Sequence, residues 1–319
     1  MNIFQHLCSE KQWETTEICK VMKEFKRQHY VNQLILRKHN DMIKIITGLR
    51  RSGKSYLLNT LFVNHLLEQG VSVDCIIQID LEDAKNKPLR DPMIMLRYIE
   101  ERSNDSRQYY VILDEVQLMS EFEEILNTLL KRRKYDVYVT GSNSRFLVTD
   151  VITEFRGRGD EIRIYPLSIA ELHEAFPEKS WIDLWREYSL YGGLPQVVLM
   201  TDEVQKTKYL KQLFRTTYLK DILDRYRIQQ VEEFSQLIDF VASAIGSLTN
   251  PLKLANTFVT KGFKLDSRTV NQYLGYLLDS FLISEAKRYD IRGKQYIGSP
   301  CKYYFTDIGL RNARLNFRQ

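Results

Sequence analysis

The chain has 319 residues, the length of about two domains. Its composition, 44% hydrophobic and 27% charged, is that of a folded globular protein and excludes an intrinsically disordered chain. The four cysteines and five histidines show no metal-ligand spacing, which excludes a disulfide framework or a zinc site and favours a reducing compartment. The formal net charge of +5 permits an anionic partner without requiring one. No apolar run approaches the ~18 residues of a membrane span, and early acidic residues do not fit a secretory signal, so we expect a cytoplasmic protein.

Apolar strands alternate with amphipathic helices in the first half of the chain. The expected elements, in chain order, are a helix over 12–28, a strand over 43–47, a helix over 55–70, a strand over 71–81, a helix over 92–102, a strand over 109–113, a helix over 121–132, and strands over 137–140 and 162–165. This alternation predicts an α/β fold with a parallel sheet covered on both faces.

The pattern changes after Pro166. Residues 168–246 read as helical, broken by the turn signal YGGLP at 191–195. Residues 231–319 predict helices over 232–245, 251–260 and 267–281, followed by short strands over 284–289 and 302–306. Three helices and a hairpin are the order of a winged helix-turn-helix. We therefore divide the chain into an α/β domain with an N-terminal helix (1–168), a helical lid (169–230) and a winged helix (231–319).

A phosphate-binding loop is indicated directly after the first strand. The segment fits GxxxxGK[ST] without a mismatch: Gly48, Leu49, Arg50, Arg51, Ser52, Gly53, Lys54 and Ser55. Glycines let such a loop curl so that backbone N–H groups point at phosphate oxygens, and the helix that follows, with Tyr56 in its first turn, adds its positive end. Lys54 would reach the β- and γ-phosphates and Ser55 would ligate Mg²⁺. The alternative is a chance match in a glycine turn, which the strand before and the helix after disfavour.

An acidic pair follows the strand at 109–113. Because the carboxyl ends of parallel strands face the ligand crevice, Asp114 can hold Mg²⁺ through water and Glu115 can orient or deprotonate an attacking water. The alternative is helix capping and simple solvation. The nearby Lys54 and Ser55 favour the metal interpretation.

The fourth strand ends in polar residues, 140–143. Asn143, and less so Ser142, would contact the γ-phosphate or the water as a sensor. The alternative is an ordinary turn, because Gly, Ser and Asn favour turns whatever the function.

Four arginines are candidates for contacts with phosphate. Arg156 and Arg158 precede the fifth strand, and either could supply the cation that stabilises the transition state; Arg158 is our choice. Arg50 and Arg51 lie inside the loop, although Arg51 could instead point to solvent. An arginine could also act across a subunit interface, which would make a second copy of the chain a partner.

These segments together resemble a known family. The strings IKIITGLRRSGKSYLL, YYVILDEVQ, VTGSNSRFL, RGRGDEIRIYPLSIAEL, YGGLPQVV and YLKDIL are similar to bacterial and archaeal AAA-type P-loop ATPases of the archaeal ATPase-like group. The resemblance covers about residues 25–310. It implies a sheet ordered 5-1-4-3-2, a helical lid and a winged helix. It also implies that Arg27 and Tyr30 border the adenine.

The resemblance further implies residue roles. Lys54 and Ser55 would be the Walker A pair, Asp114 and Glu115 the Walker B pair, and Asn143 the first sensor. Members usually carry a further nuclease-like C-terminal domain, of which the residues up to Gln319 contain none, so no nuclease activity is assigned. The lid shows no clear second-sensor arginine.

The predicted winged helix carries nearly all of the chain's net positive charge. Residues 231–319 contain twelve Lys and Arg against eight Asp and Glu. Duplex DNA would be contacted over 268–296 by the polar side of the third helix and by the wing: Arg268, Asn271, Gln272, Tyr276, Lys287, Arg288, Tyr289, Arg292, Lys294 and Tyr296. The core face of that helix would be Val270, Leu274, Leu277 and Phe281. The alternative is a module that binds a protein, because Asp279 and Asp290 would repel DNA.

The sequence therefore predicts a Mg²⁺-dependent ATPase, with ATP preferred over GTP because no NKxD-type guanine motif is visible. Its hydrolysis would drive a switch that acts on nucleic acid. One alternative is a slow signalling switch that binds a protein, and another is a degenerate scaffold, which the intact loop and acidic pair disfavour. Trp181 and Trp185, at i and i+4 on a helix, are expected in the core.

Overall fold

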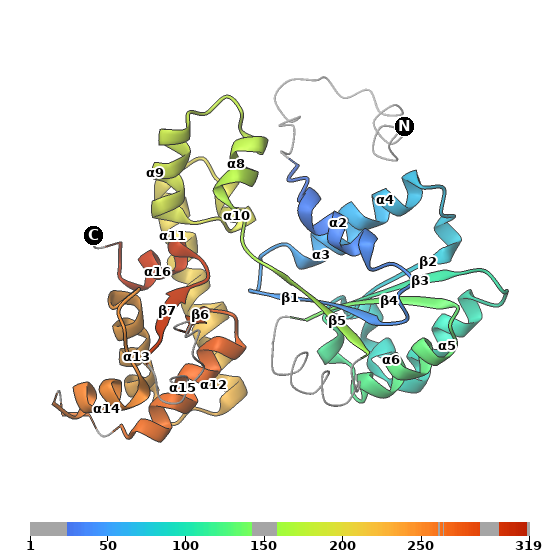
Figure 1. Ribbon diagram of the computed structural model, residues 1–319. Coiled ribbons are helices and arrows are strands. Elements are labelled where there is room, and N and C mark those ends of the chain that lie inside the picture. Colours follow the sequence, from blue (N-terminus) through green and yellow to red (C-terminus); the bar gives the residue numbers. More distant parts are fainter. Residues whose placement is uncertain (1–23, 142–157, 261, 264, 288–299, 318–319) are drawn as a thin grey trace, which may run out of the picture.

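A sheet-containing part and a helical part lie side by side in the computed structural model (Figure 1). The residues it describes are 24–141, 158–260, 262–263, 265–287 and 300–317. The sheet-containing part extends to β5, from which the chain passes directly into the helical part.

The central sheet has five parallel strands in the order β2-β3-β4-β1-β5, which confirms the predicted order read from the other edge. The strands are β1 (Ile43–Gly48), β2 (Ile76–Asp80), β3 (Tyr109–Asp114), β4 (Tyr135–Thr140) and β5 (Gly159–Ile164). Strand β1 lies between β4 and β5, and its register with β5 runs from Ile43 opposite Gly159 to Gly48 opposite Ile164.

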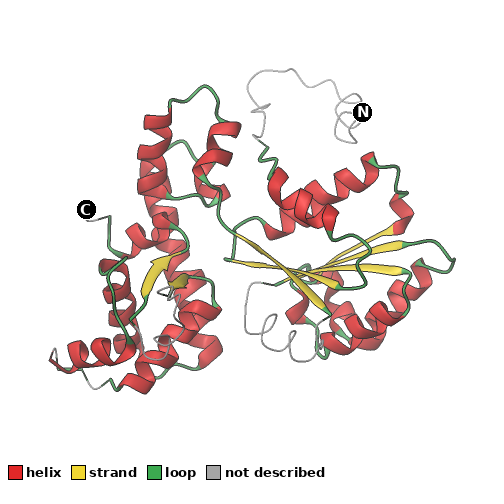
Figure 2. Ribbon diagram, in the orientation of Figure 1, coloured by secondary structure: helices red, strands yellow, loops and turns green. Residues whose placement is uncertain are grey.

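Helices cover both faces of this sheet (Figure 2). One face carries α2 (Gln28–Leu36), α3 (Lys54–Tyr56), the π-helical η1 (Leu57–Phe62) and α4 (Val63–Glu68); the other carries α5 (Pro92–Arg102) and α6 (Phe122–Lys131). Short 3₁₀ helices lie at η2 (Val73–Cys75), η3 (Ala84–Arg90) and η4 (Val116–Leu118). Successive strand residues alternate between the faces, so Ile45 packs with α5 and α6 whereas Ile46 packs with α2 and η1.

The N-terminal helix expected over 12–28 falls mostly outside the described residues, which begin at 24. Residues 24–27 are not helical, and a helix that was not predicted, α2, begins at Gln28. Val31 and Leu34, one turn apart, form its buried face.

The helical part contains ten helices and one hairpin among the described residues. They are α8 (Ile169–Ala175), α9 (Trp181–Tyr191), α10 (Pro195–Val198), α11 (Glu203–Leu213), the π-helical η6 (Phe214–Leu219), α12 (Lys220–Tyr226), α13 (Val231–Ser243), α14 (Pro251–Thr260), α15 (Ser267–Asp279), β6 (Ile283–Ala286), antiparallel β7 (Lys302–Phe305) and α16 (Ile308–Arg314). The order from α13 to β7 is the one expected of a winged helix.

One hydrophobic core joins the predicted lid to the predicted winged helix. It runs from Tyr191 in α9 through Phe214 and Phe234 to Leu277 and Ala313. No break in this core marks residue 230, so the boundary drawn there stays a prediction.

A buried carboxylate joins the YGGLP turn to the C-terminal helix. Asp307, the N-cap of α16, accepts hydrogen bonds from the N–H groups of Gly193 at 2.8 Å and Leu310 at 3.0 Å. Burial raises the pKa of Asp307 to about 6. The turn is tied back to the end of β5, because the Leu167 N–H donates to the Gly193 carbonyl at 2.8 Å.

The expectation that Trp181 and Trp185 lie in the core is wrong. Their exposed fractions are 52% and 59%, and Ile182 beside them is 65% exposed. The buried face of α9 is formed instead by Leu184 and Tyr191. A spacing of four residues fits any face of a helix, so it did not identify the inner one.

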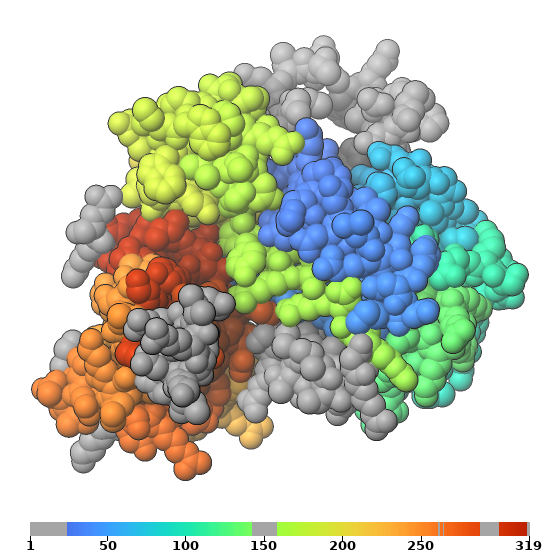
Figure 3. Space-filling model, viewed as in Figure 1, coloured from blue at the N-terminus to red at the C-terminus, as the bar shows by residue number. Residues whose placement is uncertain are grey.

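The sheet and helical parts also meet at the surface, where residues near the N-terminus (blue) lie against the yellow-green start of the helical part (Figure 3). The cysteines at 75 and 301 are buried and unpaired. In the described part of the chain, no helix is both long enough and apolar enough to cross a bilayer.

Candidate nucleotide-binding site

The loop of residues 48–55 begins at the carboxyl end of β1 and ends in α3. Its first residue, Gly48, has φ +134°, and a Cβ there would lie 2.1 Å from the carbonyl oxygen of Ile164 in β5. Only glycine fits a backbone of this conformation packed so closely against a neighbouring strand. The register of β1 and β5 therefore fixes where the loop leaves the sheet.

Lys54 turns its side chain back into this loop. Its Nζ donates to the carbonyl oxygens of Gly48 at 3.1 Å and Leu49 at 3.3 Å, and the residue is only 4% exposed. Burial lowers the pKa of Lys54, and the carboxylates of Glu115 and Asp114 oppose that shift. The structure thus brings the cation of the predicted Walker A pair close to both predicted Walker B acids.

The backbone between Arg51 and Lys54 has the form of an anion-binding nest. Arg51 (φ +64°) and Gly53 (φ +96°) are left-handed residues that flank Ser52, an arrangement that turns N–H groups to one side. The Ser52 hydroxyl is buried and has no hydrogen-bond partner among the described residues. A buried hydroxyl left in this way within a curled loop fits a site that takes an oxygen-rich anion such as phosphate.

Asp114 lies at the end of β3, two strands from β1. It is buried, and it accepts hydrogen bonds from Thr140 Oγ1 in β4 and from Asn59 Nδ2 in η1, the latter at 3.2 Å. Burial raises the pKa of Asp114, while hydrogen bonds from Ser55 and Thr140 oppose the shift. A serine hydroxyl beside a carboxylate is the pair of hard oxygen ligands that Mg²⁺ takes together with phosphates and water. Ser55 and Asp114 therefore fit a magnesium ion.

Glu115 follows Asp114 directly, but its backbone is left-handed, at φ +54°. Its N–H donates to Thr140 Oγ1 at 2.9 Å, and its carboxylate accepts a hydrogen bond from Gln117. Thr140 thus contacts both acids, a role that was not predicted from the sequence although the end of this strand was singled out. A hydroxyl residue directly before the polar string GSN was the signal that could have identified it.

Three side chains of the loop region contact other parts of the protein. Arg50 pairs with Glu82 at 3.1 Å, Arg51 Nη1 donates to Tyr209 in α11 at 2.5 Å, and the Tyr56 hydroxyl donates to Glu24 at 3.1 Å. These contacts engage all three side chains within the protein, so the part of these residues in binding phosphate would be played by the backbone.

Arg158 is not brought to the loop. Its carbonyl accepts a hydrogen bond from the Ile43 N–H at 2.8 Å, so it lies level with the first residue of β1, whereas the loop follows the last. The two ends of β1 are separated by roughly 16 Å at ~3.3 Å per residue. This placement disagrees with Arg158 as a catalytic cation in its own site. Asn143, Ser142 and Arg156 lie outside the described residues.

Arg27 contacts the loop from its outer side. The guanidinium is buried and donates to the carbonyl oxygens of Ser52 and Tyr165, each at 2.7 Å, and to Glu171 at 3.0 Å. The Tyr30 hydroxyl accepts a hydrogen bond from the Tyr165 N–H at 3.2 Å. The predicted proximity of these two residues to an adenine stays a prediction.

The predicted DNA-contacting helix, α15, has the expected two faces. Val270, Leu274 and Leu277 are buried, and Phe281 beyond its end is buried too, whereas Arg268, Asn271 and Gln272 are exposed. Tyr276 is stacked on Tyr226 at 3.7 Å between ring centroids, so its ring is engaged within the protein. Lys287 pairs with Glu285 at 3.4 Å, and the wing residues Arg288, Tyr289, Arg292, Lys294 and Tyr296 lie outside the described residues.

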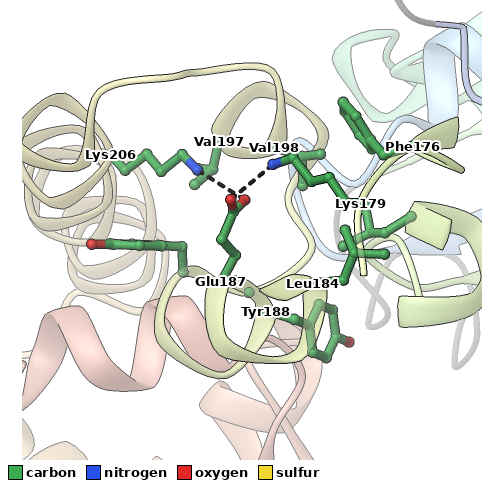
Figure 4. Close-up of a pocket in the computed structure, with 11 residues that line it drawn as sticks. Phe176, Lys179, Leu184, Glu187, Tyr188, Val197, Val198 and Lys206 are labelled. Carbon is green, nitrogen blue, oxygen red and sulfur yellow. Dashed lines mark hydrogen bonds and ion pairs between the residues drawn. The ribbon is translucent and has the colours of Figure 1, made fainter. Parts of the chain in front are cut away.

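A separate cavity in the helical part is too small for a nucleotide (Figure 4). Its volume of about 20 Å³ is room for one water molecule. The Glu187 carboxylate accepts hydrogen bonds from Lys179 at 2.8 Å and Lys206 at 3.4 Å, and these lysines hold the pKa of Glu187 below its usual range against the effect of burial. The charged groups that line this cavity therefore pair with one another.

Within the described residues, no group of three or more His, Cys, Asp or Glu could hold a metal ion. This finding is compatible with the serine–carboxylate pair, because Mg²⁺ takes few ligands from the protein itself.

Two families match separate parts of the chain. One, described as an AAA domain, matches residues 40–173, and the other, a domain of unknown function, matches residues 182–319. The first spans the sheet with its phosphate loop, and the second spans almost the whole helical part. Tyr209, which contacts Arg51, belongs to the second.

Known relatives share both parts. An uncharacterized protein of Haemophilus influenzae is 36% identical over 290 residues, which cover 89% of this chain and 72% of that protein. An uncharacterized protein of Methanocaldococcus jannaschii is 25% identical over 288 residues, covering 86% of this chain and 62% of the relative. The chain thus spans somewhat under three quarters of the length of these relatives.

Among solved structures, the Aeropyrum pernix ORC2 protein in its ADPNP-ADP complexes is similar at 12% identity and a TM-score of 0.45, with 96% of each chain covered. A likeness at that level does not bear on function. The match of the AAA domain to the sheet and its loop, and the 36% identity to the Haemophilus protein over both parts, are the stronger findings. The chain belongs to the family of AAA-type P-loop ATPases in which the AAA domain is followed by this C-terminal domain of unknown function.

Proposed function

We propose that the chain binds ATP with Mg²⁺ at the loop of residues 48–55 and hydrolyses it. The observation that carries the proposal is the position of Lys54. Its buried ammonium lies inside the loop and close to the carboxylates of Asp114 and Glu115. A buried cation beside a nest of N–H groups and an acidic pair has the charge pattern that a magnesium triphosphate requires.

The residues of the site divide the work as follows. Lys54 and the loop amides would hold the phosphates, and Ser55 with Asp114 would hold Mg²⁺, which supplies charge neutralisation at the phosphates when bound. Glu115 would position the attacking water and accept its proton. Thr140 would position both acids, because its hydroxyl donates to the Asp114 carboxylate and accepts from the Glu115 N–H.

Phosphate release from ATP tests this proposal. We expect Glu115→Gln to keep ATP binding and to lower phosphate release by about 10²-fold or more, because only the carboxylate can accept the proton. Lys54→Ala should lose binding as well. Glu100→Gln, on α5 away from the loop, is the matched control and should behave as the wild type. Release that persists unchanged in Glu115→Gln would contradict the assigned role.

We further propose that hydrolysis drives a switch that acts on duplex DNA through residues 268–296. Support comes from the exposed polar face of α15, formed by Arg268, Asn271 and Gln272, and from the excess of Lys and Arg over Asp and Glu in residues 231–319. A helix with such a face can enter a major groove, and basic side chains around it can contact phosphates.

Fluorescence anisotropy of a labelled duplex at ~50 mM salt tests this second step. We expect Arg268→Ala to weaken binding and to reduce the slope of log affinity against log salt by about 1. Lys208→Ala, an exposed cation on α11, is the control. No binding of any duplex by the wild type would remove the DNA proposal and leave ATP hydrolysis untouched.

The alternative is a slow switch whose helical part binds a protein. The observation in its favour is the group of large apolar side chains exposed on α9: Trp181, Ile182 and Trp185. Exposed tryptophans are typical of protein interfaces, where they supply much of the binding energy. Slow single-turnover hydrolysis together with no affinity for DNA would favour this alternative.

A further inference from the structure

The phosphate loop has an outer side that faces the domain of unknown function. Tyr218, in η6, donates a hydrogen bond from its hydroxyl to the carbonyl oxygen of Arg50 at 2.7 Å. Tyr218 is only 3% exposed, and burial raises its pKa well above the ordinary value, so the hydroxyl keeps its proton. The neighbouring Leu49 side chain is fully buried in the hydrophobic core of the same domain.

A hydrogen bond to a loop carbonyl also orients the next amide. In a planar trans peptide the C=O of one residue and the N–H of the next point in opposite directions. Tyr218 holds the Arg50 carbonyl outward, and therefore directs the Arg51 N–H inward. Arg27 has the same effect on the peptide between Ser52 and Gly53. Its hydrogen bond to the Ser52 carbonyl directs the Gly53 N–H inward.

Arg27 is itself fixed by three acceptors. Its Nε donates to Glu171, and one Nη donates to the Tyr165 carbonyl, while the other contacts Ser52. Glu171 is also part of the capping box of α8 with Ser168. The orientation of the guanidinium thus depends on the first helix of the helical part. Pro195, at the start of α10, lies near the same point of the loop, 3.8 Å from where a Cβ of Gly53 would be.

We propose that Tyr218 and Arg27 are positioning residues that aim the Arg51 and Gly53 amides at a bound phosphate. Tyr218 lies within residues 182–319, so the domain of unknown function completes the nucleotide site of the AAA domain. This inference rests on the proposed binding of ATP. It deepens that proposal by assigning part of the phosphate affinity to the second domain.

Nucleotide titration of Tyr218→Phe tests the inference, because this change removes one hydroxyl and keeps the shape of the ring. The loss of one neutral hydrogen bond predicts an increase of about fivefold in Kd for both ATP and ADP. At saturating ATP, kcat should stay near the wild-type value while KM rises. Tyr135→Phe is the matched control: it removes a buried hydroxyl, bonded to Ser103 at 2.6 Å, from the opposite end of the sheet.

Arg27→Lys is the second variant, and it keeps the charge. A single ammonium cannot hold three acceptors in the geometry of a guanidinium, so we expect Kd for both nucleotides to rise at least fivefold. The inference is overturned if Tyr218→Phe and Tyr135→Phe bind ATP and ADP as tightly as the wild type. Failure of the wild type to bind either nucleotide would instead overturn the proposed function, so the two failures are distinct.

Discussion

Replacement of Gly48 by alanine tests how the sheet sets the position of the loop. The added Cβ would lie 2.1 Å from the Ile164 carbonyl oxygen, and the residue has φ +134°. The backbone conformation alone costs about 1–2 kcal/mol for a residue with a side chain. Because the atom in the way is main chain of a paired strand, it cannot turn aside, and overpacking adds about 1–3 kcal/mol. We expect Gly48→Ala to lower the free energy of unfolding by roughly 2–5 kcal/mol.

Urea denaturation of three alanine variants separates the two contributions. Gly70 has φ +83° and no atom within 4 Å of the point where a Cβ would lie, so Gly70→Ala measures the conformational cost alone, about 1–2 kcal/mol. Gly53 has φ +96° and its nearest contact is an ordinary 3.6 Å, so Gly53→Ala should resemble Gly70→Ala in stability while it weakens nucleotide binding. If Gly48→Ala is no less stable than Gly70→Ala, the close approach of β5 does not constrain the loop.

Three further predictions concern buried polar groups. Lys44→Met leaves the buried carboxylate of Asp136 without its ion-pair partner in β1. We expect urea titrations to show a free energy of unfolding lower by about 3–5 kcal/mol, and a loss below about 1 kcal/mol would refute this. Because the pKa of Asp307 is raised to about 6, the folded state binds more protons than the unfolded state between about pH 4 and 6, so stability should fall as pH rises through that window. Urea titrations at pH 4.5 and 6.5 should show a loss of roughly 2 kcal/mol, and Asp307→Asn should remove it. Thr140→Val removes the hydroxyl that contacts Asp114 and should lower kcat for ATP about tenfold or more with little change in Kd; an unchanged kcat would exclude its positioning role.

The three inner strands, β1, β3 and β4, could be predicted from the sequence because they are mostly apolar runs, which are typical of strands buried on both faces. Each of these three strands ends at a glycine or a polar residue: Gly48, Asp114 and Thr140. The helix predicted over 92–102 has the same bounds in the structure as α5, where Pro92 follows an Asp91 cap. The helix α2 was missed because only Val31 and Leu34 are buried in it, which is too weak a pattern to identify a helix.

The loop and the acidic pair were predictable because their chemistry is local in sequence. The outer contacts of the loop were not, since Tyr218 lies 168 residues from Arg50 and only the packing of η6 brings the two together. Arg158 shows the opposite error. It is close in sequence to a strand that borders β1, but it precedes that strand and therefore lies at the wrong end of the sheet.

Isothermal titration calorimetry with magnesium ATP tests the central claim most directly. We predict that the wild type binds one nucleotide per chain with measurable heat and that Lys54→Ala, although folded, gives none. A folded wild type that gives no heat, or a Lys54→Ala variant that binds as tightly as the wild type, would contradict the assignment of the loop as a nucleotide site.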